Sequence, residues 1–141
     1  MDFNPDTVRK LTSEISSALS CLKELALLPE DQFLSDPHKI ASAKYNLIVA
    51  IEGTIDLCNH VISRNGFRTP EDYADTFRVM AERGAFDTTF AEALTQMARF
   101  RNRLVHIYWD ISVADLRRIL TTRLPDVHRF LNEFGAFIGL R

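Results

Sequence analysis

Residues 88–108 read TTFAEALTQMARFRNRLVHIY, and apolar side chains recur along this stretch every three or four positions. At about 100° per residue of an α-helix, one narrow stripe collects these residues: Phe90, Ala93, Met97, Phe100, Leu104 and Ile107. A stripe of this kind packs against a hydrophobic core. The stretch therefore predicts an amphipathic helix that begins after Asp87 and ends between Tyr108 and Asp110.

The polar residues of this helix fall on the side opposite the stripe, within an arc of roughly 160°. They include Arg101, Asn102, His106 and Tyr108. Arginine carries a permanent planar cation that can hold two phosphate oxygens, and histidine exchanges protons near neutral pH. A surface arginine and a partly buried histidine are the ordinary alternative. Four such side chains on one small surface favour a functional face suited to chemistry on phosphate.

Cap residues, prolines and glycines delimit the remaining helices. We expect these helices to run from Asn4-Pro5 to about Leu28, from His38 to about Arg64, from Thr69-Pro70 to Gly84, and from Ser112 to Phe134 with a break at Leu124-Pro125. A polar loop is expected at residues 30–32, and no alternating strand pattern competes. The predicted fold class is an all-α antiparallel bundle of about five helices.

Length and composition predict one domain over residues 1–141, because 46% hydrophobic residues can supply a core for a chain of this size. The net charge of −2 gives no global attraction to nucleic acid. A polyanion would therefore need a local patch, which Arg99, Arg101 and Arg103 could supply.

The two cysteines, Cys21 and Cys58, are isolated in helical patterns, which favours buried thiols in a reducing compartment and predicts a cytoplasmic protein. We find no signal peptide or membrane-spanning run in the sequence and expect no membrane partner. No metal-binding or nucleotide-binding motif is present, so no metal or cofactor is expected.

A second polar row lies in the helix expected after His38. It consists of Glu52, Asp56, Asn59 and His60. Periodicity alone favours the solvated face of an amphipathic helix. The functional alternative is an acid that holds Arg101 or orients His106, and the candidates for this supporting role are Glu52 and Asp56.

The segment Arg101-Asn102-x-x-x-His106-x-Tyr108 resembles the Arg-x4-His-x-Tyr signature of HepT-like toxins, a branch of the HEPN superfamily. The resemblance extends through residues 52–63, 69–73 and 94–100 and covers most of the chain. It implies a HEPN-like two-fold homodimer in which the signature helices of two protomers face each other across a cleft. It also implies a metal-independent endoribonuclease, because RNA carries its own nucleophile, the 2′-hydroxyl.

In this resemblance Arg101 and His106 are catalytic, and Asn102 positions one of them. The implied partner is an antitoxin of the minimal nucleotidyltransferase (MNT) type, which in some pairs transfers AMP onto the tyrosine matched by Tyr108. Two alternatives remain open: a non-catalytic helical adaptor, and a dimer that binds nucleotides without cleaving RNA. The arrangement of Arg101 and His106, either open to a cleft or sealed by packing, separates the adaptor from the nuclease.

Overall fold

The computed structural model describes residues 1–107 and 110–140 of the chain. Within these residues the secondary structure is entirely helical. The helices are α1 (Pro5–Leu27), α2 (Glu30–Leu34), α3 (Pro37–Arg64), α4 (Tyr73–Glu82), α5 (Thr88–His106), α6 (Val113–Thr122) and α7 (Leu124–Ile138). The all-α class is therefore confirmed.

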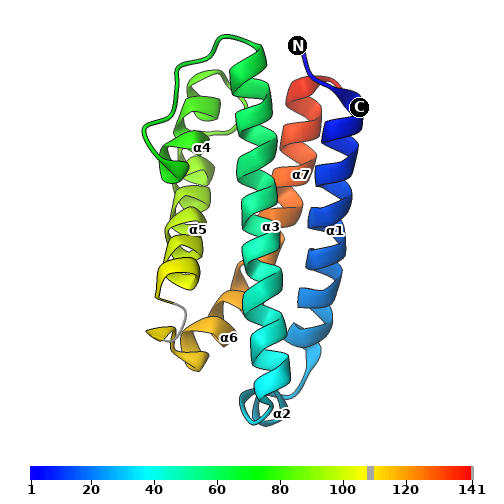
Figure 1. Cartoon of the computed structure of the whole chain (residues 1–141), viewed down its shortest axis with the longest axis vertical. Helices are drawn as coiled ribbons and strands as arrows, with labels where there is room; N and C mark the ends of the chain where they lie inside the picture. Colours follow the sequence, from blue (N-terminus) through cyan, green and yellow to red (C-terminus); the bar gives the residue numbers. More distant parts are fainter. Residues whose placement is uncertain (108–109, 141) are drawn as a thin grey trace.

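The long helix α3 runs through the middle of the bundle (Figure 1). In Figure 1, α1 and α7 lie on one side of α3 and the α4–α5 pair lies on the other, while α6 crosses near one end of the molecule. Helix α1 packs along α3, and α4 packs along α5. One cluster of buried hydrophobic side chains draws on all of these helices, so the polar side chains of α3 and α5 are held on a rigid frame.

Side-chain caps explain where most helices begin. Asn4, Asp36, Asp72, Asp87 and Ser112 each accept hydrogen bonds from backbone N–H groups of the first turn that follows. Helix α4 starts later than the sequence predicted, because its cap is Asp72 and not a residue near Thr69-Pro70. The predicted stop at Gly84 is confirmed by its left-handed φ of 88°.

The described residues form more helices than the expected five. Residues 30–34 form the short helix α2 where a loop was predicted, with Phe33 fully buried and two acidic residues in the first turn. The last stretch is divided into α6 and α7, because Pro125 has no N–H to continue the helix. Of the two cysteines, which are both free, Cys58 is buried as expected and Cys21 only half-buried.

Gly53 brings α3 and α1 into close contact. A Cβ atom at this position would overlap Cγ1 of Ile15, which is fully buried. Overpacking typically costs about 1–3 kcal/mol, and alanine regains about 1 kcal/mol in helix propensity. We therefore expect Gly53→Ala to lower the free energy of unfolding by up to about 2 kcal/mol in a denaturant titration.

A double-mutant cycle with Ile15→Ala provides the control for this prediction. If the close approach is the cause, Gly53→Ala should cost less in the Ile15→Ala background than in the native chain. A Gly53→Ala protein that is more stable than the native chain would contradict the prediction.

Candidate active site

Helix α5 presents its predicted stripe to the core. Phe90, Met97, Phe100 and Leu104 are buried, while Ala93 and Ile107 are half-buried. The helix ends at His106, earlier than the sequence predicted, and the N–H of Ile107 bonds to Arg103 O.

Arg101 does not point away from the core as the helical wheel predicted. The residue is only 9% exposed, because its long side chain extends back over α3 and α4. The Nε atom donates to Glu52 Oε1 at 3.0 Å, and Nη2 bonds to the same oxygen. The guanidinium carbon lies 4.8 Å from the centre of the Tyr73 ring, within the range of a cation–π contact.

Asn102 completes the contacts of Arg101. Its side-chain oxygen accepts a hydrogen bond of 3.0 Å from Arg101 Nη1. Three of the five guanidinium N–H donors thus have protein partners, and two make no hydrogen bond with a described residue. A guanidinium fixed in this way on three sides is oriented before any ligand arrives.

His106 is exposed and occupies the last position of α5. It is five residues beyond Arg101, which places it about 7.5 Å along the helix and about 140° around it. Its ring makes no hydrogen bond or ion pair with another described residue. The Cβ atoms of Arg101 and His106 therefore share α5 but point in different directions around it, and half-buried Asn102 lies between them in the helical wheel.

The polar row of α3 divides into parts with different contacts. Glu52 reaches Arg101, whereas the exposed carboxylate of Asp56 makes no hydrogen bond with a described residue. Partial burial and, next, repulsion from Glu52 raise the pKa of Asp56, and attraction to Arg101 opposes this shift. His60 Nε2 accepts a 2.9 Å hydrogen bond from the backbone N–H of Asn4 and so anchors the start of α1.

Tyr108, a candidate of the sequence analysis, lies outside the described residues. One contact was missed by the sequence reasoning, because Tyr73 was assigned no role there. Tyr73 opens α4 and reaches Arg101 on α5 only through the tertiary packing of these two helices. Its local sequence gives no signal of this contact.

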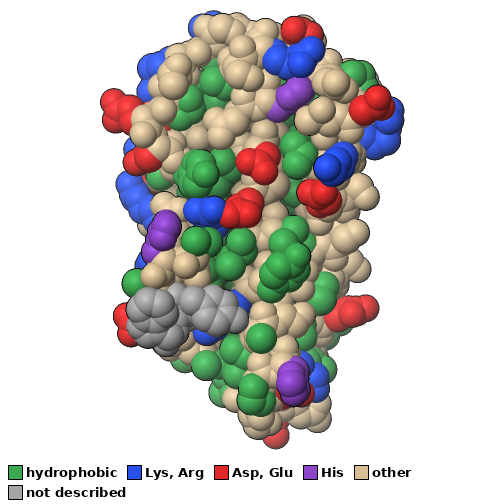
Figure 2. Space-filling model, in the orientation of Figure 1, with side chains coloured by type: hydrophobic (Ala, Val, Ile, Leu, Met, Phe, Trp, Pro, Cys, Tyr) green, Lys and Arg blue, Asp and Glu red, His purple; other side chains and the backbone are tan. Residues whose placement is uncertain are grey.

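Exposed hydrophobic side chains lie near the Arg101–Glu52 pair. Tyr45 on α3 is 66% exposed, Tyr73 is 45% exposed and Val105 is 41% exposed. Figure 2 shows hydrophobic side chains on the face of α3 that also carries acidic and basic groups. Tyrosine is enriched at interfaces between protein chains.

The part of the chain that the structure describes contains no group of three or more metal-ligating side chains that could hold an ion. No helix among these residues has the length and hydrophobicity needed to cross a bilayer.

An all-α bundle with this helix order is the fold of solved HEPN toxins. The chain superposes with a TM-score of 0.86 on the tri-AMPylated Shewanella oneidensis HEPN toxin in complex with its MNT antitoxin, at 21% identity, covering 94% of this chain and 99% of that one. The family model described as "Ribonuclease HepT-like" matches residues 15–134. The chain therefore belongs to the HepT-like family.

Two relatives are similar in sequence. One is the mRNA nuclease HepT of Shewanella oneidensis, 23% identical over 128 residues, covering 89% of this chain and 96% of that protein. The other is a putative RNase of Archaeoglobus fulgidus, 30% identical over 87 residues, covering 62% of this chain and 64% of that protein.

Proposed function

We propose that this protein is the toxin of a HEPN/MNT toxin–antitoxin system and cleaves RNA without a metal ion. Membership of the HepT-like family and the similarity to an mRNA nuclease support this function. The observation that carries it is the Arg101 guanidinium, which Glu52 and Asn102 hold in place while two of its N–H donors have no hydrogen-bond partner among the described residues. These two donors suit a phosphate, which arginine recognises through paired N–H groups.

In the proposed mechanism the 2′-oxygen of RNA attacks the adjacent phosphorus and the 5′-oxygen of the next nucleotide leaves. His106 accepts the proton of the 2′-hydroxyl or delivers a proton to the leaving oxygen, as general base or acid. Arg101 stabilises the negative charge that develops on the phosphoryl oxygens, and Asn102 positions Arg101. The products are a 2′,3′-cyclic phosphate and a 5′-hydroxyl.

A two-fold homodimer supports this chemistry better than a single chain. Arg101 and His106 diverge by about 140° around α5, so facing copies of this helix would gather more of these groups at one phosphate. The exposed side chains of Tyr45, Tyr73 and Val105 supply apolar surface for such an interface.

The proposed antitoxin is an MNT-type nucleotidyltransferase that transfers AMP onto Tyr108. The Shewanella toxin, which shares the fold, is tri-AMPylated in its complex with an MNT antitoxin. AMP on Tyr108 would add bulk and negative charge two positions after His106, where it would oppose binding of a phosphate. We expect co-expression with such a partner to raise the mass of the native chain by AMP units and to leave Tyr108→Phe unchanged. An equal gain in the Tyr108→Phe protein would place the modification elsewhere.

The cleavage activity is tested with purified protein, total RNA and excess chelator. We expect fragments that end in 2′,3′-cyclic phosphate. Cleavage that appears only after a divalent ion is added would overturn the metal-independent mechanism.

A non-catalytic adaptor is the second candidate, and the burial of Arg101 against Glu52 favours it, because the pair could serve packing alone. Absence of both RNA cleavage and AMP attached to the protein would support the adaptor function. A nucleotide-binding dimer without nuclease activity would instead bind free nucleotides in a direct titration and leave RNA intact.

A further inference from the structure

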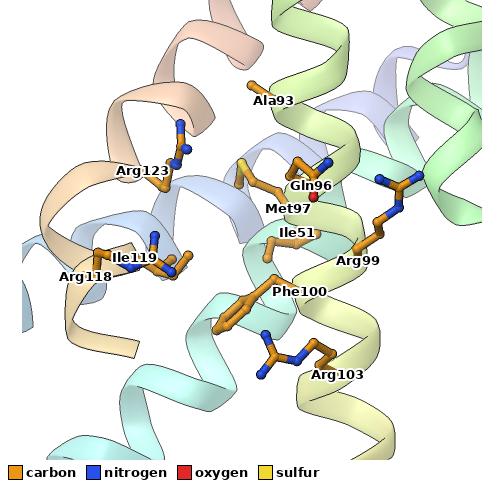
Figure 3. Close-up of a pocket in the computed structure, with 10 residues that line it drawn as sticks. All are labelled: Ile51, Ala93, Gln96, Met97, Arg99, Phe100, Arg103, Arg118, Ile119 and Arg123. Carbon is orange, nitrogen blue, oxygen red and sulfur yellow. The ribbon is translucent and has the colours of Figure 1, made fainter. Parts of the chain in front are cut away.

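A second cationic site lies between α5 and α6, on a different face of α5 from Arg101. It is a cavity of about 300 Å³. Its lining includes Arg99 and Arg103 of α5 and Arg118 and Arg123 at α6, together with the apolar residues Ile51 and Phe100 (Figure 3). No acidic residue lines this cavity. We refer to it as the arginine pocket.

The four guanidinium groups of the arginine pocket are available to a ligand. None of them makes a hydrogen bond with a described residue. Their ion pairs are long: Arg99–Glu92 at 3.9 Å, Arg118–Asp115 at 3.8 Å and Arg123–Asp126 at 3.6 Å. By contrast, Arg68 donates four hydrogen bonds to Asp75 and Glu82, and Arg101 is held by Glu52 and Asn102. Surface ion pairs at such distances contribute little to stability, so the arginine can readily exchange its carboxylate for another anion.

The arginines that α5 contributes to the arginine pocket lie on the same side of the helix as His106. Arg99, Arg103 and His106 follow one another at spacings of four and three residues, which places them within about 60° of one another around the helix. The rise from Arg99 to His106 is about 10 Å. A row of cations therefore leads from the pocket to the histidine, although the whole chain has a net charge of −2.

We propose that the arginine pocket binds the phosphate backbone of an RNA strand next to the bond that is cut. This inference rests on the proposed nuclease function. Guanidinium groups together with apolar side chains suit a nucleic-acid strand, which presents phosphates together with flat bases. The row of cations ends at His106, where the reacting phosphate of that strand would lie. An acidic segment of a partner protein would need no such alignment with His106.

The test uses Arg99→Gln/Arg118→Gln, which removes one cation from each wall of the pocket. These side chains are 50% and 59% exposed and are held only by long contacts, so the fold should be unaffected. The matched control is Arg9→Gln/Arg64→Gln, which removes two exposed cations of α1 and α3 outside the pocket. Both double substitutions are introduced into the His106→Ala protein, so that the RNA is not cleaved during the measurement. Thermal melting verifies that each variant is folded.

Binding of a labelled single-stranded RNA of about 12 nucleotides is measured by fluorescence anisotropy across a range of salt concentrations. We expect the pocket variant to bind about tenfold more weakly at low salt. The slope of its log binding constant against log salt concentration should fall in magnitude by about 1.4, corresponding to two lost phosphate contacts. The control variant should match the His106→Ala parent.

Equal affinity and slope in the pocket and control variants would overturn the assignment, even if the native protein cleaves RNA. If the native protein does not cleave RNA but the pocket variant still loses RNA affinity, the proposed nuclease function fails and the binding site stands. A deca-glutamate peptide serves as the second probe. Peptide binding as tight as RNA binding, with the same loss in the pocket variant, would overturn the RNA assignment in favour of an acidic protein partner.

Discussion

His106→Ala is expected to slow RNA cleavage by about 10²–10⁴-fold, the usual contribution of a general acid or base. The imidazole is the only group of the proposed mechanism that exchanges protons with the RNA. The side chain is exposed at the end of α5 and makes no hydrogen bond with a described residue, so its removal leaves packing intact. Initial rates on one defined RNA, in the presence of chelator, measure this effect.

His128→Ala provides the matched control. His128 is also exposed, but it lies on α7 and makes no hydrogen bond with a described residue. The control should cleave at the native rate, and both variants should melt at the native temperature. Equal rates for the two variants would exclude His106 from the chemistry.

The sequence predicted the helices well where caps and periodicity agreed. Asn4 and Asp87 lie where the sequence placed the starts of their helices, and the apolar stripe of α5 faces the core. Helix α2 was missed because five residues are too short to display a helical period. Its stability comes from Phe33, which is buried by tertiary packing that the local sequence does not reveal.

The candidate site was predicted less completely. The polar row of α3 suggested Glu52 and Asp56 as acids that could hold Arg101, and Glu52 is the one that bonds to it in the structure; the supporting role itself stays a prediction. A helical wheel gives the direction of a Cβ atom, however, and the long arginine side chain turns back from that direction to a carboxylate 49 positions away. The ring of Tyr73 belongs to another helix, so its contact with Arg101 depends on how α4 and α5 pack.

Arg101→Lys should lower the cleavage rate by about 10²–10³-fold, comparable with the loss of one donor that stabilises a developing oxyanion. Lysine keeps the positive charge and can still pair with Glu52. It lacks the planar fork that bonds to Glu52 and Asn102 and still has two donors without a partner among the described residues. The melting temperature should therefore change little while activity is lost. Arg64→Lys, on an exposed part of α3, is the matched control and should retain the native rate.

Glu52→Gln determines whether Glu52 acts through the arginine. If Glu52 only positions Arg101, cleavage should fall in the Glu52→Gln protein, and the same change should have little further effect in the Arg101→Lys background. Independent effects that multiply would instead indicate a separate role for the carboxylate. Native rates in both single variants would mean that the Arg101–Glu52 pair serves packing alone, which is the arrangement that the adaptor function requires.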